Sequence, residues 1–197
     1  MALSGAKLAG GNPANNRVKN DFYATNPEAV EALLKREKFD GLKFLEPCVG
    51  AGHIAEVIKK HFPEATVDCI DIEYRGYAGT VTTDFLQLKT DKKYNAIITN
   101  PPYSLALEFI EKSMQLIERE GKIAMFLKLQ FLEGEKRKKF FEKFPPATIY
   151  VFRKRMATWK NGEPKDAHGK NWATTMCHAW YVWEAGKPPV APIIKWI

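Results

Sequence analysis

Four consecutive residues in the middle of the chain have the composition of a site that grips a planar amine or amide. Asn100, Pro101, Pro102 and Tyr103 follow the apolar run 96–98, which predicts a buried strand. A side-chain amide, two prolines and an aromatic ring at a strand end make a rigid corner with a polar tip and a flat face. A hydrolase would require an activated nucleophile here, and this corner contains none.

A glycine-containing segment lies upstream, between a predicted strand and a predicted helix. It comprises Glu46, Pro47, Cys48, Gly50 and Gly52. The glycines allow a ligand to approach the backbone closely, but the lysine of a phosphate-binding loop and the third glycine of a dinucleotide fingerprint are absent. The charge of Glu46 favours a cationic ligand over pyrophosphate. A tight turn before a helix is the alternative interpretation.

Two carboxylates stand at the ends of the next two predicted strands. Asp71 follows the glycine segment by about twenty residues, the position from which an acidic side chain accepts hydrogen bonds from ribose hydroxyls. Asp84 is followed by Phe85, and this pair suits the amino edge and the face of an adenine ring. Each carboxylate alone could be a helix cap or a turn residue, but together they favour a nucleoside ligand.

Strand-like and helix-like runs alternate along the chain and predict an α/β fold of the Rossmann-like kind. We expect seven strands, at 42–45, 66–70, 80–83, 94–99, 123–127, 148–152 and 178–183. We expect helices beginning at 26 and over 54–62, 105–117 and 134–144. This alternation predicts a mostly parallel sheet covered on both faces, with its ligands at the carboxyl ends of the strands. The last two strands have no helix between them, so we expect an antiparallel C-terminal hairpin at one edge.

Length and composition describe an ordinary globular chain. The 197 residues predict a flexible arm over 1–20 and a single domain over 21–197. The chain has no run of about eighteen apolar residues and no secretory h-region, so we expect no membrane partner and a cytoplasmic location. Three scattered cysteines argue against a disulfide framework, and none has zinc-site spacing, so we expect no metal.

The charge of the chain favours a polyanionic partner. The net charge is +7, for which nucleic acid is the first candidate and a solvated lysine-rich surface the alternative. The segment 153–173 combines basic and aromatic residues that suit phosphate contacts and base stacking. The candidates for DNA contact are Arg153, Lys154, Arg155, Trp159, Lys160, Lys170 and Trp172. A solvated loop is again the alternative.

These motifs together resemble the class I S-adenosylmethionine-dependent methyltransferases. Among these, the chain is similar to the small phage-type enzymes that methylate the N6 amino group of adenine in DNA, over nearly all of residues 21–184. The matching segments are 21–25 (N-terminal cofactor motif), 46–52 (glycine-rich motif), Asp71 (ribose-binding acid), Asp84–Phe85 (adenine-contacting pair) and 100–103 (catalytic [DNS]-P-P-[YFW]). The chain departs from the larger DNA methyltransferases because only 153–173 is left for target recognition, which predicts low sequence specificity.

The resemblance implies S-adenosyl-L-methionine as the methyl donor and S-adenosyl-L-homocysteine as the product. It adds Phe22, Tyr23, Thr25, Ile72 and Asn100 to the cofactor-binding residues named above. The implied partner is double- or single-stranded DNA in a bacterial or phage-infected host cell, with the target base flipped into the pocket. The Asn100 and Pro101 carbonyls would then accept the two N–H bonds of the adenine amine, while Tyr103 stacks on the base.

Other acceptors present a similar pair of N–H bonds to such a corner. The methyltransferases of release-factor glutamine share the N-P-P-Y motif, but they carry a helical domain before the glycine segment, where this sequence has about forty-five residues. An RNA adenine or guanine amine is a further alternative. A non-catalytic DNA-binding module is disfavoured, because both the corner and the acidic residues are intact.

Overall fold

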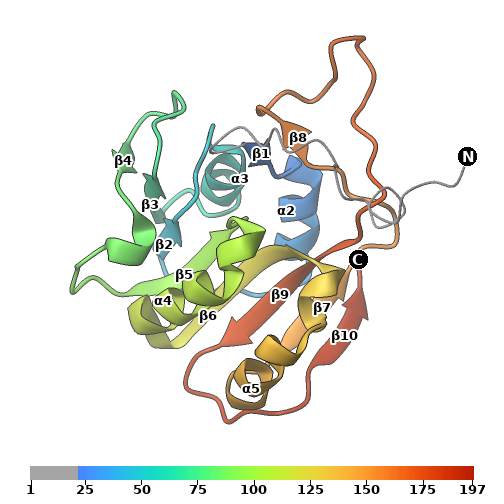
Figure 1. The fold of residues 1–197 in the computed structure, drawn as a ribbon. Coiled ribbons are helices and arrows are strands. Elements are labelled where there is room, and N and C mark those ends of the chain that lie inside the picture. Colours follow the sequence, from blue (N-terminus) through green and yellow to red (C-terminus); the bar gives the residue numbers. More distant parts are fainter. Residues whose placement is uncertain (1–21) are drawn as a thin grey trace, which may run out of the picture.

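The computed structural model describes residues 22–197, so the arm expected over 1–20 lies outside the described residues. Its centre is an eight-stranded sheet in the order β10-β7-β9-β6-β5-β2-β3-β4 (Figure 1). The strands are β2 (Lys43–Glu46), β3 (Thr66–Asp71), β4 (Thr80–Thr82), β5 (Tyr94–Thr99), β6 (Ile117–Lys128), β7 (Thr148–Val151), β9 (His178–Glu184) and β10 (Ile193–Trp196). The predicted α/β fold with a mostly parallel sheet is confirmed.

One strand runs against all the others. β9 is antiparallel to both β6 and β7, whereas the remaining neighbours in the sheet pair in parallel. The predicted pairing of the last two expected strands is therefore confirmed, but its position at the edge was wrong. β9 lies between β6 and β7, and an eighth strand, β10, forms the edge beside β7. Short, exposed and flanked by proline, β10 carries little sequence signal of a strand.

Helices cover both faces of the sheet (Figure 1). α2 (Pro27–Leu34) and α3 (His53–His61) pack on one face, and α4 (Ala106–Leu116) and α5 (Glu135–Lys143) pack on the other. Successive side chains of β6 belong alternately to the two hydrophobic cores. Ile123 and Met125 face α4 and α5, whereas Ala124 and Phe126 face α2 and α3. No helix within residues 22–197 is long and apolar enough to cross a bilayer.

A second, two-stranded sheet joins the N-terminal segment to the loop that follows β7. β1 (Tyr23–Ala24) pairs antiparallel with β8 (Trp159–Lys160). The N–H group of Asn161 also donates to the carbonyl oxygen of Phe22 at 2.9 Å. The predicted cofactor motif and the predicted DNA-contacting loop are therefore neighbours in space, although the sequence places them far apart.

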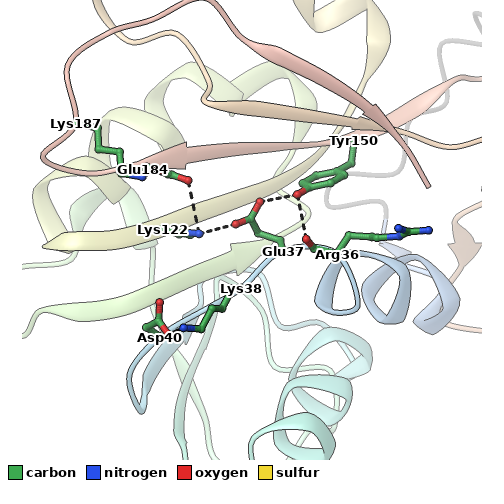
Figure 2. Close-up of polar contacts among 8 residues, drawn as sticks. All are labelled: Arg36, Glu37, Lys38, Asp40, Lys122, Tyr150, Glu184 and Lys187. Atoms are coloured by element: carbon green, nitrogen blue, oxygen red, sulfur yellow. Dashed lines mark hydrogen bonds and ion pairs between the residues drawn. The ribbon is translucent and has the colours of Figure 1, made fainter.

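A buried ion-pair network ties the end of α2 to the middle of the sheet (Figure 2). Lys122 of β6 lies 2.5 Å from the Oε1 atom of Glu37 and 3.6 Å from the Oε1 atom of Glu184 in β9. The hydroxyl of Tyr150 in β7 donates to the Oε2 atom of Glu37 at 2.7 Å. The Glu37 side chain is 8% exposed, so these partners replace the contacts with water that it loses on folding.

Glu37→Ala should therefore lower the free energy of unfolding by about 3–5 kcal/mol, because it leaves the half-buried Lys122 without its nearest carboxylate. The matched control is Asp40→Ala, which breaks a pair with Lys38 whose side chains are 84% and 71% exposed. That change should lower stability by less than about 1 kcal/mol. Urea unfolding measures both values, and equal effects would contradict the assignment.

Candidate active site

The predicted site residues gather along one rim of the sheet. Glu46, Asp71 and Asn100 stand at or just after the carboxyl ends of β2, β3 and β5, and Lys128 ends β6. Because β9 runs in the opposite direction, it brings its first residue, His178, to the same rim, where it pairs with Lys128. Asn100 therefore has β2 and β3 on one side and β6, β9 and β7 on the other.

The glycine segment is shaped by two aromatic rings packed against its backbone. Gly50 and Gly52 have φ values of 53° and 86°, in the region that favours glycine. A Cβ atom at Gly50 would lie 2.1 Å from the ring of Phe22, and one at Gly52 would lie 2.2 Å from the ring of Tyr77. Both positions thus require glycine for two reasons, the positive φ angle and the nearby ring. An ordinary turn requires only the first.

Asp71 holds this segment in place. Its Oδ2 atom accepts the N–H group of Gly50 at 2.8 Å, and its Oδ1 atom accepts the N–H group of Glu73 at 3.0 Å. The residue is 8% exposed. An ionised carboxylate accepts about four hydrogen bonds, so Asp71 keeps acceptor capacity for hydroxyl groups after both contacts.

Glu46 is a buried carboxyl group with an open oxygen. The residue is 1% exposed, and no described residue bonds its Oε2 atom. Burial raises the pKa of Glu46 well above its usual value, partly offset by a hydrogen bond from the backbone of Ala55. The hydroxyls of Thr25, after β1, and Thr99, at the end of β5, are likewise buried without a partner in the described chain. These oxygens suit a ligand that brings its own N–H or O–H donors.

The amide of Asn100 is oriented by the N-terminal strand. Its Nδ2 atom donates to the carbonyl oxygen of Tyr23 at 3.1 Å. This contact uses the donor end of the amide and leaves the Oδ1 atom as the acceptor end. Pro101 has no N–H group, so the corner offers its carbonyl oxygens and no backbone donor at that residue.

Tyr103 begins a 3₁₀ turn, η2 (Tyr103–Leu105), and stands beside two residues that the sequence did not single out. Its ring lies 6.0 Å from the ring of His178 and 5.1 Å from the Nζ atom of Lys128. His178 stacks on Phe126 at 4.9 Å, and its Nδ1 atom lies 3.0 Å from the carbonyl oxygen of Met156. Burial lowers the pKa of His178 to about 4, so its ring is neutral near pH 7.

The two residues of the predicted adenine-contacting pair, Asp84 and Phe85, differ in their surroundings. The Asp84 side chain accepts the N–H group of Leu86 at 2.9 Å and begins the 3₁₀ turn η1 (Phe85–Gln87). Phe85 is 2% exposed, and its ring packs 5.1 Å from the ring of Phe109, so the ring is not open to a ligand. The prediction that the Phe85 ring contacts the face of an adenine therefore does not fit the structure, because this ring is packed in the hydrophobic core.

The remaining cofactor candidates line the same rim. Ile72 is 61% exposed beside Asp71. Pro47 is buried, and Cys48 is half-buried with its pKa raised by burial, which keeps the thiol protonated. Among residues 22–197, no group of three His, Cys, Asp or Glu side chains could hold a metal ion.

Several residues of the loop 153–173 make contacts within the protein. Trp159 meets His53 edge-on at 5.4 Å and pairs with Ala24, so its ring belongs to the wall around the glycine segment. Lys160 pairs with Tyr23. The indole N–H of Trp172 donates to the Glu163 carbonyl at 2.7 Å.

The other basic residues of this loop reach the surface. Lys154 lies 3.0 Å from a carboxylate oxygen of Glu28. Arg153, Arg155 and Lys170 are exposed. The structure therefore divides the predicted DNA-contacting set into a structural part, centred on Trp159, and an exposed basic part.

Known proteins share this architecture. The chain aligns over 87% of its length, with 13% identity and a TM-score of 0.57, with 62% of a Listeria monocytogenes protein described as a class I S-adenosylmethionine-dependent methyltransferase. It aligns over 92% of its length, with 13% identity and a TM-score of 0.62, with 48% of a Vibrio vulnificus modification subunit described as part of a type I restriction enzyme. The chain has the class I methyltransferase fold. No protein-family model matches the sequence.

A curated protein is also similar to this methyltransferase-fold chain in sequence. A release factor glutamine methyltransferase of Bacteroides thetaiotaomicron is 26% identical over 133 residues, which are 57% of this chain and 47% of that protein. The chain thus spans about half the length of the curated relative.

The titration of His178 predicts how the stability of the protein depends on pH. Its pKa falls from the usual 6.5 to about 4 on folding, so the unfolded chain binds more protons between these values. Stability should fall by up to about 3 kcal/mol as the pH drops from 6.5 to 4. His178→Gln should flatten this part of the profile in urea unfolding, whereas the exposed control His168→Gln should not. An unchanged profile in His178→Gln would contradict the assignment.

Proposed function

We propose that the chain transfers a methyl group from S-adenosyl-L-methionine to the N6 amino group of adenine in DNA, with low sequence specificity. The observation that carries this proposal is the hydrogen bond from Asn100 to the Tyr23 carbonyl. This bond leaves the Oδ1 atom of Asn100 as an acceptor just after β5. That position lies between the carboxylates proposed to bind the nucleoside and Tyr103. Methyl transfer to a planar amine is assisted by such an acceptor, placed between the methyl donor and the substrate.

The residues on the β2 and β3 side fit the methyl donor. The open oxygen of the buried Glu46 and the hydroxyl of Thr25 suit the amino group of the methionine part. Asp71 has acceptor capacity for the ribose hydroxyls, and the Asp84 carboxylate suits the amino edge of the adenine. When bound, the cofactor supplies a methyl group on a sulfonium, which is an excellent leaving group.

The residues of the corner prepare the attacking nitrogen. An aromatic amine is a poor nucleophile because its lone pair is delocalised into the ring. Acceptance of its two N–H bonds by the Asn100 Oδ1 atom and the Pro101 carbonyl favours tetrahedral geometry and frees that lone pair. The same oxygens stabilise positive charge as it develops on the nitrogen, an oxyanion-hole effect with the sign reversed. Stacking on Tyr103 holds the base, a contact worth about 1–3 kcal/mol in single-strand readers.

The choice of DNA as acceptor has separate support. A net charge of +7 and the exposed residues Arg153, Arg155 and Lys170 favour a polyanion. Low sequence specificity follows if the loop mainly grips phosphates, since the Trp159 ring packs against His53 within the protein.

A glutamine side chain is the second candidate acceptor. The sequence similarity to a release factor glutamine methyltransferase favours it, and a primary amide presents the same pair of N–H bonds to Asn100. The corner would perform the same chemistry on either group. The acceptor must therefore be identified by experiment.

Labelled S-adenosyl-L-methionine, incubated with the protein and unmethylated DNA, RNA or release factor, distinguishes these acceptors. We expect label in N6-methyladenine from DNA, spread over many adenine contexts and decreasing steeply with salt. Label only in glutamine would establish the second candidate, and label in a single recognition sequence would refute low specificity.

Asn100→Ala should reduce the turnover number by about 10²–10³-fold, the typical loss when one electrostatic contact of the transition state is removed. Cofactor affinity, measured by calorimetry, should fall far less than the turnover number, because the acidic residues and the glycine segment are intact. The matched control is Ser104→Ala, an exposed neighbour that should keep full activity. Retained activity in Asn100→Ala would refute the assigned role.

A further inference from the structure

A hollow of about 270 Å³ lies on the acceptor side of the rim. It is formed where β7 ends and β9 begins, and its walls include Arg153, Lys154, Arg155, Cys177 and His178. Because β7 and β9 are neighbours in the sheet, the hollow is separated from Asn100 by β9 and β6 only. In the strand order it lies on the opposite side of Asn100 from Glu46 and Asp71, the proposed cofactor residues of β2 and β3.

The walls of this hollow carry positive charge that the protein leaves largely uncompensated. None of the described residues that line it is acidic. Lys154 pairs with Glu28 at 3.0 Å, but within residues 22–197 the guanidinium of Arg155 has no ion pair and donates to the sulfur of Cys177, a weak acceptor. Arg153 uses its backbone N–H group for the carbonyl oxygen of Ile197, and its guanidinium has no ion pair among residues 22–197. Two guanidinium groups are thus available to an anion.

One residue connects the hollow with the catalytic corner. His178 lines the hollow, and its ring lies 6.0 Å from the ring of Tyr103. Its contact with the Met156 carbonyl and its stack on Phe126 fix the ring in this position. A ligand that extends from Tyr103 past His178 would therefore bring its next group to the two arginines.

We propose that this hollow binds a backbone phosphodiester of the acceptor nucleic acid, next to the nucleotide whose base lies on Tyr103. The inference rests on the proposed function and deepens it, because it assigns the acceptor to a polyanion. Guanidinium groups match the geometry of phosphate oxygens with paired N–H donors. Contacts of this kind fix the position of the nucleic acid without reading its sequence.

The double variant Arg153→Gln/Arg155→Gln tests this site when its binding to a short DNA duplex that contains one target adenine is compared with that of the wild type. Fluorescence anisotropy at several salt concentrations should show that the affinity for DNA falls about tenfold or more. The slope of log affinity against log salt concentration should decrease by about one for each lost phosphate contact. Cofactor binding should be unchanged. The matched control, Lys136→Gln/Lys139→Gln, removes two exposed charges from α5 and should retain wild-type affinity.

Duplexes in which one phosphate is replaced by a neutral methylphosphonate locate the contact. The wild type should lose affinity at one position beside the target adenine, and the double variant should be insensitive there. An equal loss in the α5 control, or unchanged affinity in the double variant while the wild type methylates DNA, would overturn the phosphate site alone. Methylation of release factor with no binding of DNA by the wild type would overturn the proposed acceptor as well.

Discussion

The hydrogen bond from Asn100 to the Tyr23 carbonyl is the contact on which the candidate site depends. It holds the amide with its oxygen outward, and without it the side chain could present either end to an acceptor. The position of Tyr23 depends in turn on β8, which pairs with β1 and belongs to the loop after β7. Three distant parts of the sequence thus fix one amide. The same β1–β8 pair places Trp159 against His53 at the start of α3, so Asn100 and the glycine segment share one support.

The reversed direction of β9 determines which residues complete the rim. In a wholly parallel sheet, only carboxyl ends would meet at this edge. β9 instead contributes its amino end, so that His178 lies beside Lys128 and near Tyr103. Glu46, Asp71 and the glycine segment lie on one side of Asn100, whereas Lys128 and His178, which stand beside Tyr103, lie on the other. This separation suits a cationic donor molecule and a polyanionic acceptor that meet at a single amide.

The sequence predicted the parts of this arrangement that local patterns encode. The strand at 94–99, the alternation of strands with helices, and the positions of Asp71 and Asn100 at strand ends all follow from apolar periodicity. β1 and β8 escaped prediction because two-residue strands carry no periodicity and form only when distant segments meet. His178 and Lys128 were missed for a similar reason, since their pairing across an antiparallel register joins residues fifty positions apart. The Phe85 ring was misjudged because the identity of a residue does not reveal which side of a turn faces the core.

The central claim is that Asn100 divides one rim into a donor side and an acceptor side. Amide NMR spectra of isotope-labelled protein, titrated first with S-adenosyl-L-homocysteine and then with duplex DNA, test it directly. The account predicts that the first titration shifts resonances of the glycine segment, Asp71 and β1. DNA should then shift those of Tyr103, Lys128, His178 and the segment 153–155. Shifts from both ligands on the same side of Asn100 would contradict the account.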